Sequence, residues 1–155
     1  MNVKIKFLLA IVFLVMSCSK NTVFDPYFLA NGMGKIDINA EVKGTFPETS
    51  SFRIINAYID ANLLYLDMEY KAICAGSDNF QFIGGTLTLD EMGFAHREAR
   101  LSIDKTRESC YLIKETKIID IRELASAHQR DAEVILHIGG WRTNMTYVYV
   151  PHKKN

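Results

Sequence analysis

The sequence lacks any excess of positive charge. It contains 18 lysines and arginines against 18 aspartates and glutamates, so its formal net charge at pH 7 is zero. Nucleic acids and other acidic polymers are recognised by a concentrated basic surface. The charge balance therefore gives no basis for expecting a nucleic-acid partner.

A long hydrophobic run is also missing. The longest one extends from Phe7 to Met16, about ten residues, whereas a helix that crosses a bilayer needs roughly 20. The basic residues Lys4 and Lys6 precede this run and the small residue Ser17 follows it. This order is typical of a secretory signal peptide over residues 1–17 and does not predict a permanent transmembrane helix.

A cysteine directly follows the signal. The segment Val15-Met16-Ser17-Cys18 resembles the lipobox of bacterial lipoproteins. The resemblance implies that Cys18 is acylated, with chains such as palmitate, and becomes the mature N-terminus. Several acyl chains make a stable anchor, because each buried methylene contributes about 0.8 kcal/mol. A plain signal peptide followed by an incidental cysteine is the alternative.

The mature chain is short enough to be one domain on a tether. Removing residues 1–17 leaves 138 residues with 16 basic and 18 acidic side chains, a net charge of about −2. Turn-forming residues interrupt any regular period over residues 18–34, so we expect a lipidated tether there. If flexible, such a tether spans about 20–25 Å. Residues 35–151 are the predicted domain, and residues 152–155 form a basic tail.

Only two cysteines remain in the predicted domain, Cys74 and Cys110, separated by 36 residues. In an oxidising envelope such a pair most simply forms a disulfide, which stabilises the fold by roughly 3–4 kcal/mol on the chain-entropy estimate. The sequence phase of the preceding strand predicts that the Cys74 sulfur points into the core. A reactive or metal-binding thiol is the alternative, and it would need a nearby histidine or a Cys-x-x-Cys spacing.

Short segments of alternating apolar and polar residues follow one another from Lys35 onward, with turn residues about every 8–12 positions. The spacing leaves no room for helical crossovers between strands. We therefore expect an all-β fold, either a single antiparallel β-sandwich of immunoglobulin-like type or a small barrel, with about seven to nine strands. The pair Gly84-Gly85 is predicted to break a strand, and residues 120–129 are the one plausible helix. The clearest inward faces are Leu64, Leu66, Met68 and Tyr70; Ala99, Leu101 and Ile103; and Val134, Leu136 and Ile138.

Several scattered features together resemble a known group of proteins. These are the lipobox, Tyr70 followed by Cys74, Phe80-Gln81-Phe82, Ser109-Cys110, and Gly140-Trp141 before a tyrosine-rich last strand. The chain is similar in this respect to short uncharacterised β-sandwich lipoproteins of Bacteroidota-type bacteria. The resemblance implies the fold and the lipid anchor, and it implies no activity.

No arrangement of residues typical of catalysis or cofactor binding is found. Nucleophile-elbow, zinc-protease and P-loop motifs are absent. Asp67 and Glu69 share a strand face that we expect to be wet, where paired acids are commonplace. The histidines are scattered, and His137 is predicted to face solvent; the four are His96, His128, His137 and His152. We therefore expect no enzyme, no cofactor and no metal.

Four aromatic residues form the candidate binding surface. Rings on the exposed face of a sandwich can bind glycans or protein partners. In residues 141–150, however, apolar residues occupy both alternating sets of positions, so some of these rings are expected in the core. A binding surface and a place in the core both stay open as interpretations. The four residues are Tyr65, Trp141, Tyr147 and Tyr149.

These features together predict a lipid-anchored protein of the cell envelope that acts as a non-catalytic binding or structural module. The alternative is an inhibitor of an envelope-directed hydrolase such as lysozyme or a protease. The expected partners are the membrane, through the N-terminal lipid, and a protein or glycan. Ser19-Lys20-Asn21 carries no acidic cluster of the kind that resembles a surface-export signal. We therefore expect an outer-membrane location that faces the periplasm.

The anchor gives the first testable prediction. Replacing Cys18 by Ser removes the sulfur that would be acylated, so the variant should move from the membrane fraction to the soluble fraction when cells are fractionated. A variant that stays in the membrane as the wild type does would place the anchor elsewhere.

Overall fold

The structure is a computed structural model, and it describes residues 35–74, 77–104, 109–125 and 132–151. The fold below is that of the compact unit Gly34–Asn155. The predicted signal peptide, Cys18, the tether and the basic tail lie outside the described residues. Within the described residues, no helix is long and apolar enough to cross a membrane.

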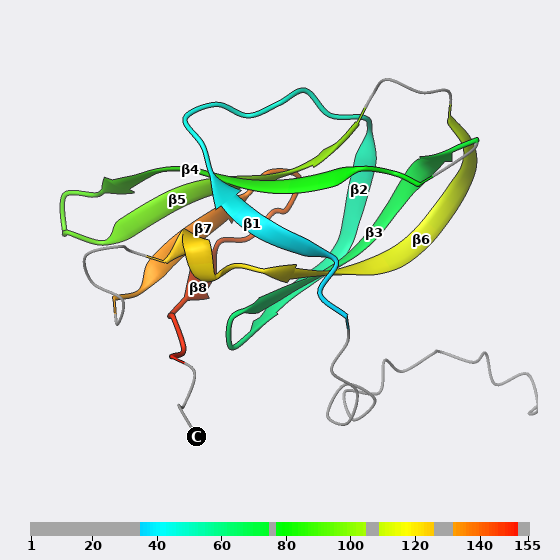
Figure 1. The fold of residues 1–155 in the computed structure, drawn as a ribbon. Coiled ribbons are helices and arrows are strands. Elements are labelled where there is room, and N and C mark those ends of the chain that lie inside the picture. The colour runs from blue at the N-terminus through cyan, green and yellow to red at the C-terminus, as the bar shows by residue number, and fades with distance from the viewer. Residues whose placement is uncertain (1–34, 75–76, 105–108, 126–131, 152–155) are drawn as a thin grey trace, which may run out of the picture. The chain divides into compact units, whose positions relative to one another are not determined.

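Eight strands form one mixed sheet that curls into a nearly closed barrel (Figure 1). Their order across the sheet is β2-β3-β6-β1-β4-β5-β7-β8. The strands are β1 (Ile38–Val42), β2 (Phe52–Asp60), β3 (Leu63–Ile73), β4 (Phe80–Leu89), β5 (Ala95–Ile103), β6 (Ser109–Asp120), β7 (Val134–Ile138) and β8 (Met145–Tyr147). The predicted all-β class and strand number are confirmed.

We expected an antiparallel sheet, but the observed sheet contains both parallel and antiparallel pairs. Strand β1 pairs in parallel with both β4 and β6, and β5 pairs in parallel with β7. Each of these pairs joins strands that are distant in the sequence, so turn residues carry no signal for them. The remaining pairs, β2–β3, β3–β6, β4–β5 and β7–β8, are antiparallel.

Strand β1 connects the two halves of the sheet. Its first residues, Ile38 and Asn39, pair with β6, whereas Ala40 to Val42 pair with β4. By changing partners along its length, β1 links the β2-β3-β6 side of the sheet to the β4-β5-β7-β8 side. Figure 1 shows β1 running between the green β4 and the yellow β6 for this reason.

The core lies inside the curled sheet. All three inward faces predicted from alternation are buried, and Leu64, Leu66 and Leu136 are fully inaccessible. Each such side chain contributes about 1.5–3 kcal/mol relative to an exposed one. Strands β1, β4, β6 and β8 add Ala40, Phe82, Ile119 and Tyr147 to the same cluster.

Two local predictions are wrong. Strand β4 continues through Gly84-Gly85, and only its register against β5 shifts there. Glycine is needed at position 84 because a Cβ would lie 2.5 Å from a methyl group of Leu124. The predicted helix over residues 120–129 is wrong for its first half, where Asp120 ends β6 and a single 3₁₀ turn, η2 (Arg122–Leu124), inserts Leu124 into the core. Residues 126–129 lie outside the described residues.

The disulfide between Cys74 and Cys110 is present, with the two Cα atoms 4.9 Å apart. It joins the end of β3 to the start of β6. The pairing register shifts between Ala72 and Ile73, which leaves Cys110 as an extra residue on β6. Cys74 is half-buried, less than its predicted place in the core, and Cys110 is exposed, so the bond lies at the margin of the core.

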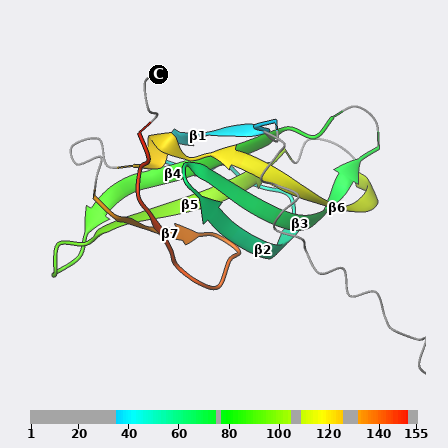
Figure 2. The same ribbon diagram turned by 90° about the horizontal axis from the view of Figure 1, so that it is seen from below.

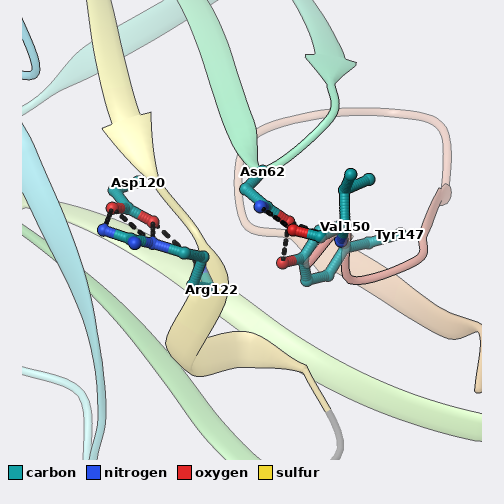
Figure 3. A network of polar contacts seen from close by, with 5 residues as sticks. All are labelled: Asn62, Asp120, Arg122, Tyr147 and Val150. Carbon is teal, nitrogen blue, oxygen red and sulfur yellow. Dashed lines mark hydrogen bonds and ion pairs between the residues drawn. The ribbon is translucent and has the colours of Figure 1, made fainter. Parts of the chain in front are cut away.

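The edges of the sheet, β2 and β8, meet at the turn between β2 and β3. The buried Asn62 side chain lies in this turn and accepts hydrogen bonds from the Val150 amide at 2.8 Å and the Tyr147 hydroxyl at 3.0 Å. Its own NH₂ group donates to the Val150 carbonyl at 2.6 Å. Figure 3 shows this network beside the Asp120–Arg122 ion pair. Asn62 therefore fastens the last strand to the first hairpin.

Replacing Asn62 by Ala should lower the free energy of unfolding by about 2–3 kcal/mol, because the fully buried Tyr147 hydroxyl loses its acceptor. Urea denaturation followed by tryptophan fluorescence measures the loss.

The matched control is Asn56→Ala. The side-chain NH₂ group of Asn56 donates a hydrogen bond to Asp67 at an exposed site. Loss of this bond should therefore change the free energy of unfolding by less than about 0.5 kcal/mol. If the two substitutions lower the free energy of unfolding equally, Asn62 does not hold the last strand to the first hairpin in the proposed way.

Candidate functional site

The four predicted aromatic residues do not form one surface. Tyr147 is fully buried and belongs to the core, so its place on a binding surface is wrong. Burial and the nearby Asp120 carboxylate raise the pKa of Tyr147 to about 12. Tyr65 is 8% exposed and stacks on Tyr58 with ring centroids 4.7 Å apart. Only Trp141 and Tyr149 are partly exposed, and both pack against the core.

The turn between β4 and β5 carries a more exposed set of apolar side chains. We call residues 89–94 the hairpin tip. Leu89 is 69% exposed, Met92 79% and Phe94 47%. The first residue of β7, Val134, lies opposite Ala95 of β5. The hairpin tip, which precedes Ala95, therefore extends past the start of β7. Figures 1 and 2 both show the light-green turn reaching beyond the rest of the sheet.

Asp90 gives the hairpin tip a defined backbone conformation. Its carboxylate Oδ1 accepts hydrogen bonds from the amides of Met92 at 3.0 Å and Phe94 at 2.8 Å. The Asp90 amide donates to the Phe94 carbonyl, and Gly93 donates back to the Asp90 carbonyl. Gly93 has a φ of +85°, a conformation that glycine adopts without strain. The three apolar side chains therefore project from a preformed turn.

The second carboxylate oxygen of Asp90 contacts a histidine pair at the base of the hairpin. Asp90 Oδ2 lies 3.2 Å from His96 Nε2, and His96 Nδ1 lies 2.8 Å from His137 Nε2. The two rings stack with 23° between their planes. The sequence predicts scattered histidines and a solvent-facing His137, but the structure brings His96 and His137 together and leaves both half-buried.

Opposing effects act on the Asp90 carboxylate. Desolvation raises its pKa, but hydrogen bonds from the Phe94 amide, His96 and the Met92 amide outweigh this effect, so the pKa lies below its usual value. The carboxylate is therefore ionised at neutral pH. Its hydrogen bonds should be lost only as the pH falls through this lowered pKa.

A shallow hollow of about 420 Å³ adjoins the pair. Its lining includes His137, Glu98, Trp141 and Asn144. Glu98 lies opposite His137 in the β5–β7 register and shares its sheet face. Among the described residues, no group of three or more histidine, cysteine, aspartate or glutamate side chains is arranged to hold a metal ion.

Arg97 lies on the opposite, inner face of β5 and does not belong to this site. Its side chain is buried, and burial lowers the pKa of its guanidinium. One terminal nitrogen donates to the Gly85 carbonyl at 2.5 Å, while Nε has no hydrogen-bond partner. Arg97 thus tightens the glycine-containing bulge of β4 from inside.

Comparison with known proteins identifies the fold. No protein-family model matches the chain, and no curated protein matches its sequence. Among solved structures, the chain is similar to a NigD-like immunity protein from Bacteroides caccae, with a TM-score of 0.52 and 11% sequence identity. The match covers 72% of this chain and 63% of that protein. At this identity the likeness concerns the fold alone.

The hairpin tip gives a testable prediction. Replacing Asp90 by Ala removes the acceptor for the Met92 and Phe94 amides, so their protection against hydrogen exchange should fall about tenfold or more. Protection of core amides on β3 should stay unchanged. Mass-spectrometric or NMR exchange measurements test this.

Glu91→Ala is the control, because this exposed neighbour accepts neither amide bond. If Glu91→Ala loosens the tip as much as Asp90→Ala does, Asp90 does not order it.

Proposed function

We propose that this protein is a lipid-anchored, non-catalytic binding protein of the cell envelope that holds a protein partner through its hairpin tip. The observation that carries the proposal is the projecting turn with Leu89, Met92 and Phe94 exposed on a fixed backbone. Large apolar side chains on a rigid element make effective anchors, since little conformational entropy is lost when they bind.

The proposed partner is an envelope-directed toxin or hydrolase, which the protein inhibits. Two features support this role over that of a structural module. A solved structure with a similar fold is a NigD-like immunity protein by its description, and a projecting loop suits insertion into the recess of another protein. The lipobox-like Val15-Met16-Ser17-Cys18 would hold such an inhibitor at the compartment where the partner acts.

The test is a quantitative pulldown from solubilised envelope with the full chain and a tip variant. The double substitution Leu89→Ala and Met92→Ala should lower the amount of bound partner about thirtyfold, if each side chain contributes in the way that interface anchors do. The exposed positions of both residues mean that folding should be unaffected.

Tyr111 and Leu112 provide the matched control. They are 61% and 64% exposed and lie beside the disulfide instead of at the tip. Replacing both by Ala should leave partner binding intact. A partner that is lost with the control pair, or kept by the tip variant, would contradict the proposed binding element.

The identity of the captured protein separates the two roles. A stoichiometric hydrolase or toxin whose activity falls in the complex would support an inhibitor, whereas a resident envelope complex would point to a structural module.

A further inference from the structure

Two imidazole rings face each other on the outer surface of the sheet. Strands β5 and β7 run in parallel, with His96 opposite Ile135 and His137 opposite Glu98. The two histidines are therefore diagonal neighbours on one face of the sheet. The facing atoms are His96 Nδ1 and His137 Nε2, at 2.8 Å.

The proton of His96 is placed by Asp90. A carboxylate can only accept hydrogen bonds, so the contact between Asp90 Oδ2 and His96 Nε2 requires the proton on Nε2. The lone pair of His96 then lies on Nδ1, directed at His137. A carboxylate that fixes the tautomer of an imidazole in this way is the usual outer partner of a metal-binding histidine.

We propose that His96 Nδ1 and His137 Nε2 bind a borderline divalent transition-metal ion, with Zn²⁺ as the representative. Asp90 is a positioning residue that does not touch the ion, and water completes the coordination. The hydrogen bond between the two rings is the metal-free state, in which the Nε2 proton of His137 occupies the place of the ion. When the ion binds, Nε2 loses this proton to solvent and the neutral His137 ring carries its proton on Nδ1.

Binding of the ion requires a rearrangement of the two rings. Zinc–nitrogen bonds of 2.0–2.1 Å at a tetrahedral angle place the two nitrogens about 3.3–3.4 Å apart. The observed separation is 2.8 Å. The nitrogens must therefore move apart by about half an ångström, and both rings must turn so that their lone pairs meet at the ion. Both side chains are partly exposed.

The surroundings favour a cation with open coordination positions. The hollow beside His137 has room for water, and Glu98, whose carboxylate forms an ion pair with Arg100, is part of its lining. Asp90 is held in turn by the Met92 and Phe94 amides, so the tautomer of His96 is fixed before any ion arrives. This inference does not depend on the proposed partner of the hairpin tip.

The experiment is a titration of the full chain, with any affinity tag and residual metal removed, with Zn²⁺ alone at pH 7. Isothermal titration calorimetry should show one equivalent bound at micromolar concentration. His96→Ala and His137→Gln should each weaken binding at least tenfold. Cu²⁺ bound to the wild type should show two imidazole nitrogens in its electron paramagnetic resonance spectrum, and the variants should lose one.

Asp90→Asn separates positioning from folding. The introduced side chain keeps an oxygen for the Met92 and Phe94 amides, but its NH₂ group faces His96 Nε2. His96 must then carry its proton on Nδ1, so affinity should fall about 10–100-fold.

His128→Ala and His152→Ala are the controls, and both should bind Zn²⁺ as the wild type does. Absence of saturable binding at micromolar Zn²⁺, or binding that survives the His96 and His137 substitutions, would overturn the proposal.

Discussion

The two edges of the sheet are held together at one end by Asn62, whose side-chain amide replaces the main-chain pairing that joins strands elsewhere. Its oxygen and nitrogen together satisfy the Val150 peptide groups and the Tyr147 hydroxyl. The main-chain carbonyl of Asn62 also accepts a hydrogen bond from the amide of Ile121, next to the 3₁₀ turn that inserts Leu124 into the core. The Asn62 side chain thus joins the turn before β3 to β8 and the segment after it, and the Asn62 main chain joins the same turn to the end of β6.

The alternation of apolar residues predicted the core well. Alternate residues of a strand point to opposite faces of the sheet, so a strand with one apolar face can bury only that face. This is why Leu64, Leu66 and Met68 are buried. The parallel pairings could not be predicted in this way. Strand β1 meets β4 and β6 through contacts between residues distant in the sequence, and no local pattern encodes which strands pair.

The candidate site was less predictable. Asp90 and Gly93, three residues apart between two strands, are a turn signal that could have located the hairpin. Nothing in the sequence could have shown that His96 and His137 lie together, since 41 residues separate them and only the parallel β5–β7 register makes them neighbours. The predicted aromatic binding surface is wrong at Tyr147 for a related reason. Tyr147 lies in the core, where its hydroxyl donates to Asn62, and it is not available at the surface.

The parallel pairing of β1 with β4 has a mechanical consequence. Ala40 lies opposite Phe82, so the start of the described domain and the hairpin tip lie at opposite ends of this strand pair. A pull between Lys35 and the tip would run along both strands and load their hydrogen bonds in shear. The bonds would then have to break together, whereas the same bonds in a hairpin pulled from its open end would break in succession. The domain should therefore resist unfolding by force best when the force acts between its N-terminal end and the hairpin tip.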